Sequence, residues 1–131
     1  MRLEPSRPDD GGLDDGDDRQ WFDGALVPTP EAMVVAVRGE VDISTVPRLN
    51  ELLAEALDKS STVVVDLTNL DFLDSSGIAA LVRAQERAST ELAALVLRSP
   101  NRAVRRVLSI SGVDQVMVID GDGPDDDRPA G

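Results

Sequence analysis

The sequence predicts a single α/β domain with a small mixed, mostly parallel β-sheet and about three to four packed helices. The chain has 131 residues, which is room for one hydrophobic core. Strand-like apolar runs alternate along it with apolar stripes at helical spacing, and the connections are short. Such alternation produces right-handed crossovers, and these place successive strands parallel to one another.

Acidic segments flank the predicted domain. Residues 1–20 contain seven acidic residues and three arginines, with few large apolar side chains to stabilise a fold. Residues 121–131 have a similar composition. We therefore expect an ordered domain over residues 21–120 between two disordered acidic tails, 1–20 and 121–131. The simplest role of these tails is to keep the protein soluble.

Two strands open the domain. Trp21–Val27 is a candidate edge strand, because prolines follow it directly. Met33–Val37 is rich in β-branched residues and ends at Gly39, which is typical of a strand. The connection between the two runs is short, so we expect them to pair as a hairpin that adds an antiparallel edge to the sheet.

The first helix follows this pair. Its apolar residues recur every three or four positions, at Val46, Leu49, Leu52, Leu53, Ala56 and Leu57. Ser44 or Thr45 can cap its N-terminus. Pro47 falls in its first turn, where a missing N–H does no harm.

Three further runs predict the remaining strands. Thr62–Leu67 and Leu92–Leu97 are short and continuously apolar, which is typical of strands buried on both faces. Val116–Ile119 closes the pattern as the last strand. All three are expected to join the parallel part of the sheet.

Two helices link these strands. The first is marked at helical spacing by Ile78, Leu81, Val82, Gln85 and Ala88. The second is opened by Ser99 and Pro100, and Gly112 suits its C-terminal stop. Three arginines lie opposite the apolar stripe of this last helix, so we expect them on a solvated face: Arg102, Arg105 and Arg106.

Composition excludes several kinds of function. The chain has no cysteine and no histidine, which rules out disulfides, thiolate zinc sites and imidazole bases. A net charge of −12 argues against binding to nucleic acid or to an anionic membrane surface. No apolar run has the length of a bilayer span, and the N-terminus lacks the basic start of a signal peptide. We expect a cytoplasmic protein without a cofactor or a metal.

The densest functional signal is the tetrapeptide Asp74-Ser75-Ser76-Gly77 between a strand and a helix. Side chains there lie at a helix N-terminus, where free N–H groups and the helix dipole favour negative charge. A phosphate on a serine would be stabilised locally and would add about −1.5 to −2 charges to an exposed edge. The competing interpretation is structural, because Asp and Ser are also favoured helix caps.

The residues around this turn carry a resemblance. Val35-Ala36-Val37-Arg38-Gly39-Glu40-Val41-Asp42 precedes the first helix, and Val64-Val65-Asp66-Leu67 leads through Leu70, Phe72 and Leu73 into the turn. Ser99-Pro100 leads later to Ser111-Gly112. Over about Met33 to Ile119 the chain resembles the STAS family, and specifically the bacterial anti-sigma factor antagonists, also called anti-anti-sigma factors.

This resemblance implies a partner-switching mechanism. In the family, the unphosphorylated antagonist binds an anti-sigma factor, a serine kinase of the histidine-kinase-like ATPase class, and so releases a sigma factor. The kinase phosphorylates the serine after the Asp of this turn, and the complex separates. A PP2C-type phosphatase reverses the modification. The family precedent favours a monomer that docks on a dimeric kinase.

Carried onto this chain, the resemblance makes Ser75 the phosphoacceptor, with Ser76 as second choice. Asp74 is the adjacent acid that helps to present it, and Glu40 and Asp42 are candidate kinase contacts. Asp42 could equally brace the entry of the first helix as an Asx-type cap. The partner-binding residues expected are Glu40, Asp42, Asp74, Ser75, Ser76 and Gly77.

Other functions remain as alternatives. A ligand-sensing or transport-associated STAS module, not controlled by phosphorylation, would use the same fold. A hydrolase would need a base to activate Ser75 or Ser76, and only a carboxylate could serve. A carboxylate metal site or a phosphoaspartate pocket is disfavoured, because no lysine lies nearby in the sequence and a magnesium site usually borrows substrate phosphates, for which the chain has no binding motif. The acidic residues that could form either one are Glu40, Asp42, Asp66, Asp71 and Asp74. We therefore expect a binding protein that is not an enzyme.

Overall fold

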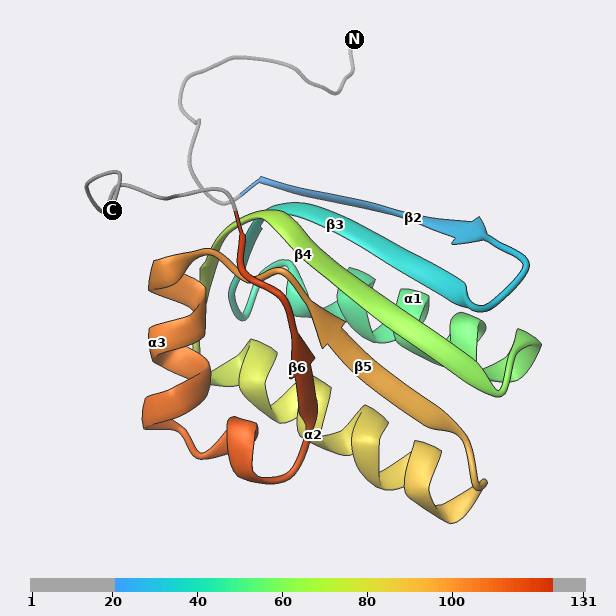
Figure 1. Ribbon diagram of the computed structural model, residues 1–131. Coiled ribbons are helices and arrows are strands. Elements are labelled where there is room, and N and C mark those ends of the chain that lie inside the picture. The colour runs from blue at the N-terminus through green and yellow to red at the C-terminus, as the bar shows by residue number, and fades with distance from the viewer. Residues whose placement is uncertain (1–20, 124–131) are drawn as a thin grey trace, which may run out of the picture.

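The computed structural model describes residues 21–123, in which strands and helices alternate (Figure 1). The expected tail 1–20 and residues 124–131 of the other tail lie outside the described residues. The elements are β2 (Phe22–Pro28), β3 (Met33–Val41), α1 (Val46–Lys59), β4 (Thr62–Leu73), α2 (Ser75–Thr90), β5 (Ala94–Arg98), α3 (Arg102–Ile110), the 3-10 turn η1 (Val113–Gln115) and β6 (Val118–Asp120).

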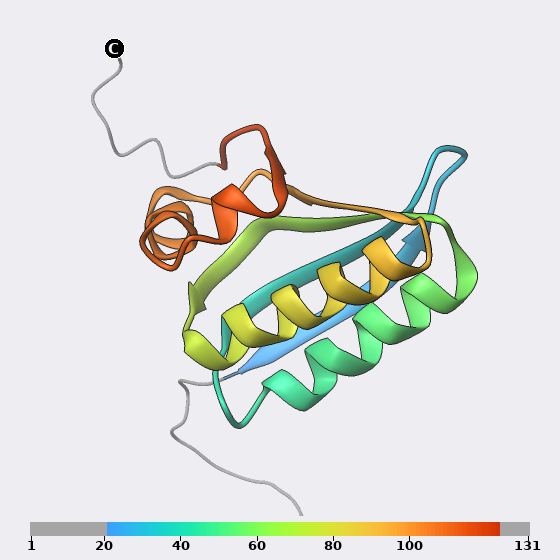
Figure 2. The same ribbon diagram turned by 90° about the horizontal axis from the view of Figure 1, so that it is seen from below.

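The described strands form one five-stranded sheet in the order β2-β3-β4-β5-β6. β2 pairs antiparallel with β3, and the other neighbours are parallel. Helices α1 and α2 lie side by side across one face of this sheet, and α3 runs across their direction near β6 (Figures 1 and 2). The predicted mixed, mostly parallel sheet with an antiparallel edge is confirmed, and the described residues contain three of the three to four packed helices expected.

The core between the sheet and its helices is aliphatic. Val35, Val65 and Leu97 at the centre of three neighbouring strands have no exposed surface. Leucines of the helices belong to the same buried cluster, and these are Leu49, Leu52, Leu53, Leu81 and Leu108. Each buried side chain of this size contributes about 1.5–3 kcal/mol relative to an exposed one. This layer fixes how the strand ends are positioned.

β3 and β4 both run further than the sequence predicts. β3 passes Gly39 and ends at Val41, and β4 passes Leu67 and ends at Leu73. The pairing of the two strands contains register shifts near Ala36 and Gly39. Such irregularities break the alternation of buried and exposed residues, so the sequence pattern does not show the extension. The two strands thereby end together, directly before the loops of the candidate site.

The predicted start of the next strand at Leu92 is wrong. Leu92 is 92% exposed and has a φ of +58°, and β5 begins at Ala94. The N–H of Ala93 donates to the carbonyl of Ala88, and that of Leu92 donates to Ser89. These two bonds form a Schellman motif that ends α2 with Leu92 in the left-handed position usual for glycine. Val116 likewise precedes its strand, because β6 begins at Val118.

Two predictions about α3 need correction. Its N-cap is Asn101, whose side chain accepts from the N–H of Val104 at 2.8 Å, whereas Ser99 and Pro100 precede the cap. Arg102 and Arg106 are exposed as expected, but Arg105 is half-buried and pairs with Asp122 at 3.0 Å. Gly112 has a φ of +84° after the helix, which agrees with its predicted role as a stop.

Residues 121–123 lie against the domain. The N–H of Gly123 donates to the carbonyl of Pro100 at 2.8 Å, and Gly123 is buried. Arg105 donates to the carbonyl of Gly121. The described structure therefore continues three residues past the expected boundary at residue 120.

Candidate functional site

The β3–α1 loop and the β4–α2 junction lie next to each other at the carboxyl ends of their strands (Figure 2). Glu40 and Val41 of β3 pair in register with Phe72 and Leu73 of β4. The backbone N–H of Asp74 then donates to the carbonyl of Val41 at 3.1 Å. Residues that are more than thirty positions apart in the sequence are thus brought to one edge of the sheet.

Asp74 is the N-cap of α2. Its backbone is extended, and its Oδ1 accepts from the N–H groups of Ser76 at 2.9 Å and Gly77 at 3.3 Å. The same oxygen accepts from the Ser76 hydroxyl at 2.5 Å. These bonds satisfy N–H groups that a helix start leaves without partners. The carboxylate therefore organises the turn without bonding to Ser75.

The two serines of the turn differ in their surroundings. Ser75 is the first residue of α2 and is exposed. Its hydroxyl makes no hydrogen bond with any residue that the structure describes. Ser76 is half-buried, and its hydroxyl is held by Asp74. Ser75 is thus the hydroxyl of this turn that a partner can reach without breaking an existing bond.

Gly77 is buried where α2 starts against the strand ends. A Cβ atom on it would lie 2.8 Å from Cγ1 of Val41 and closer still to Cδ1 of Leu73. Any larger residue would push the helix start away from β3 and β4. Gly77 is therefore a buried structural residue of the turn, and its lack of a side chain allows α2 to start close to β3 and β4.

Asp42 braces the other loop. It is 8% exposed, and its Oδ1 accepts from the N–H of Ser44 at 2.9 Å, the Ser44 hydroxyl at 2.7 Å and the N–H of Thr45 at 3.1 Å. The hydrogen bonds of Ser44, with those of Thr45, hold the pKa of Asp42 below its usual value although burial raises it. Among the two interpretations left open by the sequence, this geometry is that of the Asx-type brace.

The predicted capping of α1 by Ser44 or Thr45 is wrong. Thr45 occupies the N-cap position but makes no capping bond with its side chain. Its hydroxyl instead donates to the carbonyl of Glu40 at 2.8 Å and accepts from the N–H of Asp42 at 2.9 Å. The loop is therefore closed on itself, with Asp42 at its centre.

Glu40 is half-buried at the penultimate position of β3, and its N–H donates to the carbonyl of Trp21 at 2.8 Å. Of the six expected partner-binding residues, Ser75 is exposed, three are half-buried and two are buried. The buried pair, Asp42 and Gly77, can affect a partner only through the loops they hold in place.

Asp66 lies further back along β4. Its carboxylate accepts from the hydroxyl of Thr68 at 2.6 Å and from Arg98 at 3.2 Å. Burial raises the pKa of Asp66, but the bonds from Thr68 and Arg98 outweigh it, so the pKa is lowered. Within residues 21–123, no three carboxylates come together in an arrangement that could hold a metal ion.

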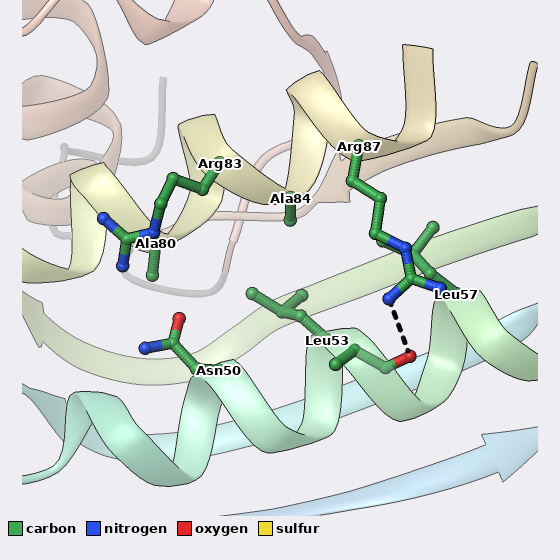
Figure 3. A pocket seen from close by; sticks show the side chains of 8 residues that line it. Asn50, Leu53, Leu57, Ala80, Arg83, Ala84 and Arg87 are labelled. Atoms are coloured by element: carbon green, nitrogen blue, oxygen red, sulfur yellow. Dashed lines mark hydrogen bonds between the residues drawn. The ribbon is translucent and has the colours of Figure 1, made fainter. Parts of the chain in front are cut away.

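A groove lies between α1 and α2, away from the serine turn (Figure 3). It is a shallow groove of about 250 Å³ with an apolar floor and with Asn50, Arg83 and Arg87 at its polar margin. Arg87 is held by Asp58 at 2.6 Å and by Glu91 at 3.0 Å. The sequence analysis missed this groove, because nothing in the pattern shows how closely two helix faces approach.

Fold and site together define a STAS domain with a capped serine turn at the start of its second helix. The family model described as "Mlab, STAS domain" matches residues 25–119, and the chain belongs to this family. The resemblance seen in the sequence motifs is thereby confirmed.

The similar proteins include anti-sigma factor antagonists. The anti-sigma-B factor antagonist of Listeria monocytogenes is 29% identical over 86 residues, which cover 65% of this chain and 75% of that protein. The anti-sigma F factor antagonist of Lysinibacillus sphaericus is 25% identical over 92 residues, 69% of this chain and 79% of that protein. The crystal structure of an anti-sigma factor antagonist from Mycobacterium paratuberculosis superposes with a TM-score of 0.65 at 29% identity. The superposition covers 76% of this chain and 85% of the Mycobacterium paratuberculosis protein.

In residues 21–123, no helix combines the length and the apolar character needed to cross a membrane.

Proposed function

We propose that this protein is an anti-sigma factor antagonist that binds a cognate anti-sigma serine kinase while Ser75 is unphosphorylated, and so releases a sigma factor. Phosphorylation of Ser75 by that kinase, of the histidine-kinase-like ATPase class, ends the complex, and a PP2C-type phosphatase restores it. The protein acts as a cytoplasmic monomer and not as an enzyme. The observation that carries the proposal is the exposed, unbonded hydroxyl of Ser75 in a turn already organised by Asp74.

The position of Ser75 supports a switch that changes the surface and preserves the fold. Its phosphate would lie at the first residue of α2, where N–H groups and the helix dipole favour negative charge. The same charge would have to be desolvated inside a packed interface, and it would face the phosphates of a kinase-bound nucleotide. The modification therefore costs binding free energy while the free antagonist tolerates it.

Ser76 is the weaker acceptor. Its hydroxyl donates to Asp74 at 2.5 Å and the residue is half-buried, so a kinase would have to break this bond to reach it. Phosphorylation of Ser76 would place the phosphate next to the Asp74 carboxylate, which now accepts a hydrogen bond from the Ser76 hydroxyl. The two negative groups would repel each other. This difference supports Ser75 as the modified residue.

The test is a pull-down from an extract of the cells that make the protein, with three baits: the wild type, Ser75→Ala and Ser75→Asp. Mass spectrometry identifies the retained proteins. We expect an ATPase-type serine kinase on the first two baits and its loss from the third. Incubating wild type and Ser75→Ala with that kinase and ATP should then give phosphate incorporation in the wild type alone.

The alternative is a ligand-sensing or transport-associated STAS module without phosphorylation control. The groove between α1 and α2 is the feature that favours it (Figure 3). Recovery of the same proteins in equal amounts by all three baits would mean that Ser75 has only a structural role at the start of α2. It would favour this second function.

A further inference from the structure

Aromatic side chains are scarce in this protein, and most of them lie at the candidate site. The chain contains one Trp, two Phe and no Tyr. Trp21 is 45% exposed and Phe72 is 46% exposed, whereas Phe22 packs against the core. Exposed aromatic residues are the types most often found as energetic hot spots of protein interfaces.

Backbone pairing places these two aromatic residues in one row. The carbonyl of Trp21 accepts from the N–H of Glu40, and Glu40 pairs in register with Phe72. Residues directly opposite each other on neighbouring strands point to the same face of a sheet. Trp21 and Phe72 therefore flank Glu40. Val41 and Leu73, the next residues along, pack against Gly77 of α2, so the row lies on the opposite face of the sheet, at the edge where β3 and β4 end.

Trp21 is held in position by two features. Gly39 has a φ of +97°, and a Cβ atom on it would clash with the carbonyl of Trp21, so only glycine allows this approach. The guanidinium of Arg38 lies 5.5 Å from the centre of the Trp21 ring, within the range of a cation–π interaction. A side chain that is ordered in advance loses less entropy when a partner covers it.

Ile43 adds a third exposed apolar side chain at this edge. It is 79% exposed in the loop that Asp42 braces, beside the β4–α2 junction. The loop is closed by bonds of Asp42 and Thr45, so this exposure belongs to a defined conformation. Ile43 is solvent-exposed and is not part of the buried cluster, so its side chain does not stabilise the core.

We propose that Trp21, Ile43 and Phe72 are the apolar anchors through which the partner kinase docks around Ser75. This inference rests on the proposed function and identifies the surface that the partner recognises. The acids that reach the surface at this edge are Glu40, Asp71 and Asp74. They specify the partner's chemistry, which is an apolar pocket rimmed by Lys or Arg side chains. Phosphate on Ser75, three residues after Phe72 and at the start of α2, acts at the edge of this surface.

Two other exposed apolar residues provide controls. Leu92 is 92% exposed in the turn before β5, at the end of the sheet opposite the site. Val118 is 61% exposed on the edge strand β6. Truncating either one removes exposed apolar surface of similar kind without touching the proposed anchors.

The experiment measures the Kd of the kinase retained by the wild-type bait for Trp21→Ala, Ile43→Ala and Phe72→Ala, with Leu92→Ala and Val118→Ala as controls. Each anchor variant is expected to raise the Kd about tenfold or more, and the controls less than about twofold. A melting curve accompanies each variant. Ile43→Ala decides the matter if Phe72→Ala is poorly folded, since Ile43 makes no core contact.

Ser75→Asp separates the two proposals. Unchanged Kd values for the anchor variants, together with loss of binding by Ser75→Asp, would overturn the anchor surface and leave the switch in place. Weakened binding by the anchor variants with full binding by Ser75→Asp would support the surface and overturn the phosphorylation switch. If no anti-sigma kinase is retained by the wild type, both proposals are wrong.

Discussion

Replacing Asp74 with alanine tests whether its side chain organises the turn. The carboxylate accepts from two backbone N–H groups of α2 and from the Ser76 hydroxyl. Alanine leaves these three donors without their partner. It keeps the backbone bond from residue 74 to the carbonyl of Val41, so the junction with β3 survives. The change therefore isolates the contribution of the cap.

The expected loss follows from measured caps in other helices. Replacing an Asp N-cap with alanine costs about 1 kcal/mol and at most about 2 kcal/mol. For a domain near 100 residues, each kcal/mol lowers Tm by roughly 4–8 °C. We expect Asp74→Ala to lie in this range. The proposed kinase-binding surface would become less ordered together with the turn, because Ser75 directly follows the cap.

The assay is thermal and urea denaturation followed by far-UV circular dichroism. Asp74→Asn is the matched variant, since its amide oxygen can accept the same N–H bonds, and it should stay within about 0.5 kcal/mol of the wild type. Ser75→Ala is the control, because its hydroxyl makes no bond to break. An unchanged Tm for Asp74→Ala would refute the cap. Equal losses for Asn and Ala would mean that charge matters and hydrogen bonding does not.

Three further predictions concern the same framework. Gly77→Ala should destabilise the fold by about 1–3 kcal/mol in urea titrations, because its methyl group would enter the space of Val41 and Leu73; a stabilised variant would contradict the close approach. Asn101→Ala should cost about 1–2 kcal/mol, since its side chain caps α3 and also donates to the carbonyl of Leu70 at 3.0 Å; Asn101→Asp keeps the cap and should cost less. The lowered pKa of Asp42 means that its charge stabilises the folded state fully above the unfolded value of 3.8, and that this contribution is lost as pH falls below 3.8 through the folded pKa. The stability gap between wild type and Asp42→Asn should therefore stay nearly constant from about pH 6 to about pH 4 and narrow as pH falls below 3.8. A gap that stays constant below 3.8 as well would show that the charge plays no part.

The order of the elements could be predicted because the core is built from one kind of residue. Aliphatic runs such as Thr62–Leu67 alternate with helical stripes, and each type has its own period. The parallel topology follows from this alternation and from short connections. Nothing in that reasoning depends on details of the loops.

The errors lie where hydrogen bonding or backbone geometry overrides hydropathy. Leu92 is apolar but occupies a left-handed position at the end of α2, so its side chain points into water. Thr45 has the residue type of a cap, but its hydroxyl closes the loop onto Glu40. In both cases the residue type favours several structures, and only the neighbouring backbone decides between them.

The site was predictable as a motif and not as a surface. The tetrapeptide 74–77 is contiguous, so its spacing was visible, and its position at a helix start followed from the strand before it. The row formed by Trp21, Glu40 and Phe72 joins three segments through strand register. Register depends on the irregular pairing near Gly39, which the sequence does not show.

The distribution of bonds at this edge explains how a phosphate could act as a switch. Asp42 and Asp74 each use one carboxylate oxygen to accept hydrogen bonds within their own loop. Gly77 allows the start of α2 to pack closely against the ends of β3 and β4. Ser75 takes no part in this framework, so its modification removes no existing interaction. Stability and binding should consequently respond to different residues. Variants of Asp42, Asp74 and Gly77 should mainly lower Tm. Ser75→Asp should instead weaken partner binding and leave Tm within about 2 °C of the wild type, since negative charge at a helix start is tolerated.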